Sequence, residues 1–252
     1  MRLLATLVCL PAMIVLSIST TQAEVYPSTY RPLPSGPTLI THATILTGTG
    51  ERLDDASLLM SDGIIVFVGD GDAPDGVTTI DASGRWVTPG LIDVHSHLGV
   101  YASPGVQAHS DGNEMTSPAT PNVWAEHSVW PQDPGFSRAL AGGVTTLQTL
   151  PGSGNLIGGR GVTLKNVYGN SYQDMKFPGA PHGLKMACGE NPKRVYGERK
   201  QLPSTRMGNM AAYRAQWIDA QKYIADQAAY EMKVADGKND ATPPKRDLRL
   251  ET

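Results

Sequence analysis

A short apolar run that ends in two histidines constrains this chain more than any other feature. The run, Gly90-Leu-Ile-Asp-Val-His-Ser-His97, has the apolar content of a buried β-strand. Residues i and i+2 of a strand share one face, so His95 and His97 are predicted to point the same way, roughly 7 Å apart along the backbone. Ser96 is then predicted to face away. Two imidazoles on one face of a strand end can converge on one divalent ion, so the spacing favours a metal site over two structural histidines.

The residues before this run have the turn spacing of a small β-rich module. Between residues 38 and 80, short apolar stretches are separated by glycines and Asp-Gly steps. Asp62-Gly63 lies between two β-rich stretches and is typical of a two-residue hairpin turn. We therefore expect a small antiparallel β-module over residues 37–84, preceded by a Pro- and Ser-rich linker over residues 24–36.

From residue 85 the pattern changes to apolar runs separated by long connections. Each run resembles a buried parallel strand; they fall at residues 86–87, 91–94, 144–150, 162–167 and 184–187. Residues 209–234 carry apolar side chains at helical spacing, which predicts an amphipathic helix. Strands that alternate with helices predict an α/β fold with a parallel sheet or barrel. The segment 101–135 is rich in Pro, Asn and Ser, and we expect it to form a lid or substrate loop.

The first 23 residues are predicted to be a cleaved signal peptide. An apolar run over residues 3–18 is followed by the small-x-small sequence that ends at Ala23. The run is shorter than the ~20 residues that span a bilayer comfortably. We expect a secreted or periplasmic protein without stable membrane insertion after cleavage. Loss of Cys9 with the signal leaves only Cys188, so no internal disulfide can form.

Composition and charge argue against a nucleic-acid partner. The 252 residues are 40% hydrophobic and carry a formal net charge of −3. The sequence has no Lys/Arg cluster with interleaved aromatic residues, which is the usual pattern of a nucleic-acid-binding surface. A small-molecule substrate is expected instead, and the sequence allows an oligomer.

Several motifs resemble one family. The stretch Val87-Thr-Pro-Gly-Leu-Ile-Asp-Val-His-Ser-His97 closely resembles the first-strand signature of the amidohydrolase superfamily, and Ala141-Gly-Gly-Val-Thr-Thr146 resembles its helix-to-second-strand junction. Pro151-Gly-Ser-Gly-Asn155 together with Gly189-Glu-Asn-Pro-Lys193 is similar to exported, imidazolonepropionase-like amidohydrolases. The resemblance covers nearly all of residues 37–252.

The resemblance implies an α/β fold in which a β-sandwich module over residues 37–84 precedes an incomplete (β/α)8 (TIM-like) hydrolase barrel over residues 85–252. A complete barrel needs at least ~200 residues, more than follow residue 85. We therefore expect a fragment, the N-terminal half of the barrel, that hydrolyses nothing in isolation. The general-base aspartate and further histidine ligands are expected beyond Thr252.

The resemblance also implies one or two divalent ions, with zinc expected and with His95 and His97 as ligands. Such an ion lowers the pKa of bound water to about 7 and polarises the scissile carbonyl. Two residues compete for the role of bridging ligand. Lys185 lies early in the apolar run at residues 184–187, whereas Glu190 lies at its C-terminal end, where the site is expected, and this position favours Glu190. Alternatively, Glu190 is a carboxylate at a helix N-terminus, where it interacts favourably with the helix dipole.

The expected reaction is hydrolysis of a C–N bond in an amide, cyclic amide or dipeptide by metal-activated water. Two alternatives stay open: a catalytically inactive, truncated module with a binding role only, and a sugar deacetylase of the same superfamily. The glycine-rich stretch 152–158 is expected to be a loop near the active site. Arg160 either meets a substrate carboxylate or is solvated. The other histidines lack a partner at ligand spacing; they are His42, His109, His127 and His182.

Overall fold

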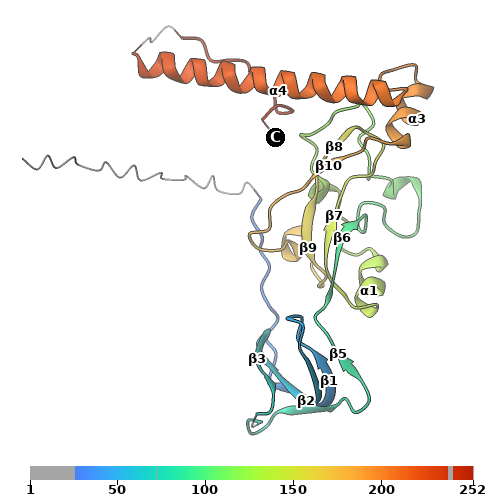
Figure 1. Cartoon of the computed structure of the whole chain (residues 1–252), viewed down its shortest axis with the longest axis vertical. Helices are drawn as coiled ribbons and strands as arrows, with labels where there is room; N and C mark the ends of the chain where they lie inside the picture. Colours follow the sequence, from blue (N-terminus) through green and yellow to red (C-terminus); the bar gives the residue numbers. More distant parts are fainter. Residues whose placement is uncertain (1–25, 72, 238–240, 252) are drawn as a thin grey trace, which may run out of the picture.

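The computed structural model describes residues 26–71, 73–237 and 241–251. The predicted signal peptide, residues 1–23, lies outside the described residues. Three parts follow one another along the molecule (Figure 1): a small β-sheet module, a central α/β part, and a long helix with the C-terminal segment beside it. Within the described ranges, no helix is long and apolar enough to cross a bilayer.

The N-terminal module is one mixed five-stranded sheet. Its strands are β1 (Thr38–Leu46), β2 (Arg52–Ser61), β3 (Ile64–Gly69), β4 (Thr78–Asp81) and β5 (Trp86–Val87). β2 pairs antiparallel with β1 and β3, whereas β4 and β5 join β1 in parallel. The expectation of an antiparallel module is thus wrong for β4 and β5, because the chain crosses from β3 to the far edge of β1. The predicted hairpin at Asp62-Gly63 is confirmed, since the φ angles of 51° and 76° suit a type I′ turn.

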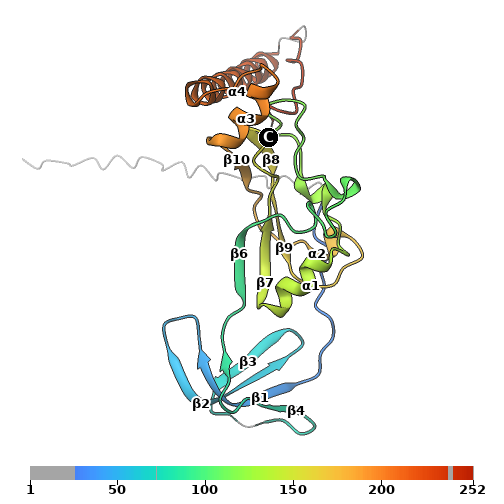
Figure 2. The same cartoon turned by 90° about the vertical axis from the view of Figure 1, so that its right-hand side faces the viewer.

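A three-stranded sheet forms the middle of the central part (Figure 2). β6 (Leu91–Ser96) pairs in parallel with β7 (Val144–Thr149), and β7 pairs antiparallel with β9 (Val162–Lys165). Helix α1 (Pro134–Ala141) contacts β7, and the short α2 (Tyr172–Met175) contacts β9. The expectation of a parallel strand at residues 162–167 is wrong, because the connection before it carries another strand in place of the crossover helix that parallel pairing needs.

That other strand belongs to a separate two-stranded sheet. β8 (Ile157–Arg160) pairs antiparallel with β10 (Leu184–Met186), so the apolar run at residues 184–187 does not join the parallel pair. Gly159 has a φ of +119°, and a Cβ there would lie 2.2 Å from the carbonyl oxygen of Val123. Only glycine fits at this crossing, where the segment 101–135 runs against β8.

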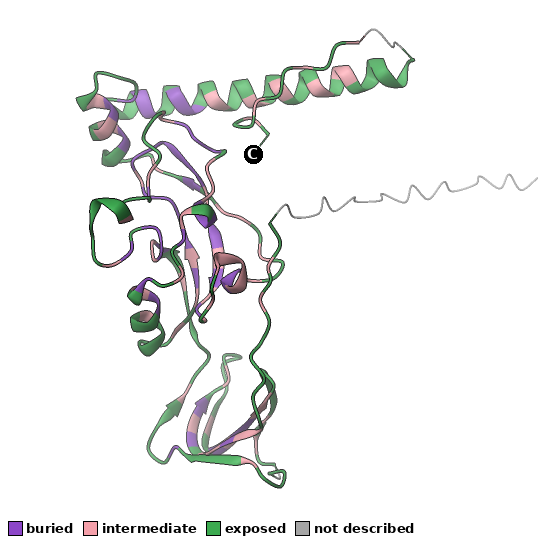
Figure 3. Cartoon of the chain, turned by 180° about the vertical axis from the view of Figure 1, so that it is seen from behind, coloured by how far each residue is buried: buried purple, intermediate pink, exposed green. Residues whose placement is uncertain are grey.

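Burial is uneven within the central sheet (Figure 3). Leu147 of β7 and Leu164 of β9 are fully buried in the main core cluster, together with Phe136 of α1. In contrast, Ile92 and Val94 of β6 are 68% and 69% exposed. The expectation of a buried strand at residues 91–94 is therefore wrong for this chain, because β6 has only one neighbouring strand among the described elements.

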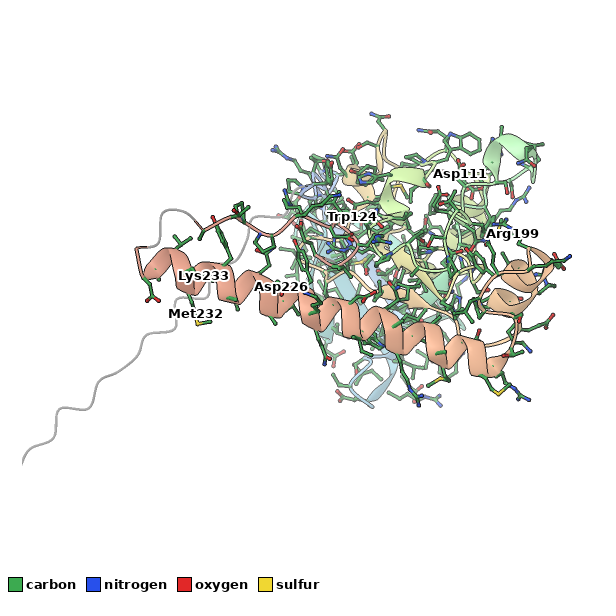
Figure 4. The ribbon with its side chains drawn as sticks, turned by 90° about the horizontal axis from the view of Figure 1, so that it is seen from above. Asp111, Trp124, Arg199, Asp226, Met232 and Lys233 are labelled. Atoms are coloured by element: carbon green, nitrogen blue, oxygen red, sulfur yellow. The ribbon has the colours of Figure 1, made fainter. Side chains whose placement is uncertain are left out.

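Two helices complete the fold: the short α3 (Glu190–Glu198) and the long α4 (Arg206–Ala235). The Thr205 hydroxyl caps α4 by accepting from the amide N–H of Gly208 at 3.0 Å. The predicted helix at residues 209–234 is confirmed, but its buried residues lie only near its N-terminus, including Tyr213. Trp217 and Ile224 remain 50% and 64% exposed. The far half of α4, which carries Asp226, Met232 and Lys233, projects away from the body (Figure 4).

Candidate metal centre

His95 and His97 lie together where β6 ends. Their ring centroids are 5.4 Å apart, with the planes nearly perpendicular. Ser96 between them is buried on the opposite face, as the alternation of a strand predicts. The Asp93 carboxylate accepts a hydrogen bond of 3.0 Å from the backbone N–H of His95, which is a contact within the strand itself.

The residue after β7 fixes the orientation of His97. The Leu150 N–H donates to the Ser96 carbonyl at 2.9 Å, and the Leu150 carbonyl lies 2.8 Å from His97 Nδ1. A carbonyl only accepts, so Nδ1 of His97 carries the proton and Nε2 keeps its lone pair. Burial lowers the pKa of His97, and the charge of Lys185 lowers it further, against the raising effect of the Leu150 hydrogen bond. A neutral ring in this tautomer suits a metal ligand.

Lys185 reaches the histidine pair from β10. Its register opposite Gly159 places it in the small sheet, and its Nζ lies 3.0 Å from Nε2 of His95, a residue 90 positions earlier. The Lys185 side chain is buried, and this burial lowers the pKa of its amine. The structure therefore gathers three nitrogen-bearing side chains: His95, His97 and Lys185.

Glu190 lies elsewhere. It is the first residue of α3 and is exposed, and no contact joins it to either histidine in the described structure. Across the described ranges, no three His, Cys, Asp or Glu side chains come close enough to share a metal ion. The two imidazoles nevertheless fit a divalent ion, and the buried lysine would complete the set as a carbamate, the product of its neutral amine and CO₂.

An open cavity of about 580 Å³ lies beside His97. Its volume is in the range of small-molecule sites. The segment 101–135 and the glycine-rich stretch after β7 form part of its wall, and α3 forms the rest. The Asn113 amide joins the first two, because it donates to the Tyr101 hydroxyl and accepts from the Gly154 N–H at 2.9 Å. The lining residues are His97, Tyr101, Asn113, Met115, Gly152, Ser153, Gly154, Asn191, Arg194, Val195, Glu198 and Arg199.

The weaker sequence candidates lie outside this cavity. The Arg160 guanidinium stacks over the Trp124 ring at 4.6 Å, and the rings of His127 and His182 lie against the same tryptophan. His109 packs on Trp130, and His42 pairs with Asp55 in the N-terminal module.

Sequence reasoning missed Asn191 and Arg194. Both residues line the cavity from the first turns of α3. Their position shortly after the apolar run at residues 184–187 was the available signal.

Known proteins resemble this chain over different lengths. No family model matches it. Amidohydrolase tasK from Hapsidospora irregularis is 34% identical over 218 residues, which are 76% of this chain and 22% of that protein. An imidazolonepropionase from Bradyrhizobium sp. is 36% identical over 105 residues, 35% of this chain and 24% of that protein. The crystal structure of an amidohydrolase from Thermotoga maritima MSB8 matches with a TM-score of 0.73 and 38% identity, over 85% of this chain and 54% of that one.

The chain combines a mixed α/β fold with a pair of histidines where β6 ends. Together with the similarity in sequence and structure, these features place this chain in the amidohydrolase superfamily. The chain spans about half the length of the Thermotoga structure and about a fifth of tasK.

Proposed function

We propose that this chain is part of a metal-dependent hydrolase that acts on C–N bonds in an amide, cyclic amide or dipeptide. The observation that carries the proposal is the 3.0 Å approach of Lys185 Nζ to His95 Nε2, beside a His97 ring held by Leu150. Relatives named amidohydrolase, imidazolonepropionase and 5-methylthioadenosine/S-adenosylhomocysteine deaminase support it.

In this proposal His95 and His97 hold the ion through Nε2, and Lys185 is the third ligand. The lowered pKa of Lys185 increases the fraction of neutral amine. A neutral amine adds to CO₂ and releases a proton, which leaves a carbamate with oxygen donors. When bound, a divalent ion supplies water of lowered pKa and polarises the scissile carbonyl. Glu190, which the sequence favours as the bridging ligand, becomes the alternative.

The proposed whole enzyme, of which this chain would be a part, is called the parent protein below, and its finer features are proposed as well. The parallel β6–β7 pair, with its histidines at the C-terminal end, supports a (β/α)8 barrel in which these are the first two strands. The five-stranded module would then be part of a flanking β-sandwich. Zinc as the metal, export directed by residues 1–23, and a general-base aspartate beyond Thr252 complete the proposal.

Metal analysis tests the ligand pair. The protein is expected to retain zinc after equilibrium dialysis, and the double variant His95→Ala/His97→Ala is expected to lose it. His42→Ala, which removes an imidazole from the N-terminal module, is the control and should leave the zinc content unchanged. An unchanged zinc content in the double variant would contradict the proposal.

A second pair of variants separates the two candidate bridging residues. Lys185→Ala should reduce zinc content and abolish the carbamate signal in ¹³C NMR after incubation with labelled bicarbonate, whereas Glu190→Gln should change neither. The reverse result would restore Glu190 as the bridge. Assays on the parent protein should show amide turnover; preferential turnover of N-acetylated sugars would favour the deacetylase alternative instead.

A further inference from the structure

The cavity beside His97 carries more positive than negative charge on its wall. Arg194 and Glu198 of α3 line it with Arg199, which directly follows the helix, together with uncharged polar groups from the loops after β6 and β7. Both loops are tied to α3: the Tyr196 hydroxyl donates to the Ser117 carbonyl at 2.6 Å, and Asn191 Nδ2 donates to the Ser153 hydroxyl at 2.5 Å. The wall that faces the metal centre is therefore polar and held in place by its own hydrogen bonds.

The two arginines of this wall have different roles. Arg199 donates to the Met115 carbonyl, and its guanidinium lies 5.6 Å from the Tyr196 ring centroid, so it braces the wall. Arg194 has no hydrogen bond, ion pair or ring contact from its side chain to any described residue. Its guanidinium fork is thus available to a ligand, and such a fork matches a carboxylate with two parallel hydrogen bonds.

Glu198 is the group that competes with a ligand for Arg194. It lies four residues further along α3, on the same helix face, and also lines the cavity. The two side chains form no ion pair of 4.0 Å or less among the described residues. A transient pair between exposed groups is weak, so a ligand carboxylate that gains bidentate bonds can displace it.

We propose that Arg194 binds a carboxylate of the substrate, so that the enzyme acts on amides that bear an acid group, such as N-acyl amino acids or dipeptides. This inference rests on the proposed function, since it assigns a substrate class to the same site. Arg194 is a specificity-determining residue in it: His97 borders the reacting end of the cavity, and Arg194 holds the acid end.

Binding to the metal-free protein tests this inference separately from the metal centre. The probes are N-acetylalanine and its uncharged counterpart N-acetylalaninamide, titrated by NMR into the 252-residue chain and into the parent protein. The acid is expected to bind about 10-fold or more tightly than the amide, because a hydrogen bond to a charged group is worth that factor. Arg194→Gln should remove this preference.

Two neighbouring variants sharpen the test. Lys193→Gln removes the same charge from α3 at a position outside the cavity and should retain the preference. Glu198→Gln removes the competing carboxylate and should increase affinity for the acid. Equal affinity for both probes, undetectable binding of the acid, or loss of preference in Lys193→Gln would overturn the inference. If the His95→Ala/His97→Ala variant still binds zinc, the proposed metal centre is wrong. If the same variant still prefers the acid probe, the assignment of Arg194 stands independently of that failure.

Discussion

β6 and β7 pair in one sheet, and the sequence predicts an apolar strand at both positions. Their surroundings in the structure nevertheless differ. β7 has β6 on one edge and β9 on the other, and α1 packs on it, so Leu147 is fully buried. β6 has one neighbouring strand within the described structure, and Ile92 stays 68% exposed. An apolar pattern specifies a strand, whereas the number of its neighbours decides how much free energy that strand contributes.

The residues that stabilise the central part and the residues of the candidate metal centre lie on different strands. β7 supplies core residues, and β6 supplies the two histidines. These are held by groups at the strand end, namely the Leu150 carbonyl and the Lys185 amine, rather than by packing of β6 itself. Changes to β7 should therefore unfold the central part, while changes to the outer face of β6 should leave it folded.

The largest expected effect is on the free energy of unfolding of the central part. Leu147→Ala leaves a cavity in the main core cluster and should lower it by about 2–5 kcal/mol. Ile92→Ala, the matched change on β6, should stay within about 0.5 kcal/mol of the unchanged protein. Chemical denaturation followed by circular dichroism measures both. Equal losses would show that β6 is as well packed as β7.

The contact between the two strands gives an intermediate effect. A Cβ at Gly90 would lie 2.1 Å from Thr145 Oγ1 and 2.4 Å from Thr145 Cγ2, at the start of β7. Gly90→Ala should therefore destabilise the pair by about 1–3 kcal/mol through overpacking. The double variant Gly90→Ala/Thr145→Gly should regain part of this loss in the same denaturation assay. No loss in the single variant would mean that the strands separate there at little cost.

The smallest expected effect contrasts His97, which directly follows β6, with His42 of β1. Burial lowers the pKa of His97, so its contribution to stability is lost as pH falls below the unfolded value near 6.5. The hydrogen bond and charge of Asp55 raise the pKa of His42, so its contribution is present below that value and is lost as pH rises through the raised pKa. NMR titration of the metal-free protein should find His42 titrating at higher pH than His97. Asp55→Asn should lower only the His42 pKa; the opposite order of titration would contradict both assignments.

Local rules predicted the parts of this fold that depend on neighbouring residues in the sequence. The Asp62-Gly63 hairpin and the long helix at residues 209–234 follow from turn chemistry and periodicity. β8 could not be predicted, because Ile-Gly-Gly-Arg has little β-propensity and becomes a strand through its pairing with β10. The approach of Lys185 to His95 joins residues 90 positions apart, so no spacing rule reaches it.

Support for His97 comes from main-chain atoms of Leu150, through an N–H that donates to Ser96 and a carbonyl that faces Nδ1. Every residue type except proline offers both groups at position 150. The Leu150 side chain is itself buried, so its identity serves packing while its main chain orients the imidazole. The orientation of the His97 imidazole therefore depends on the path of the backbone at position 150 and not on which side chain stands there.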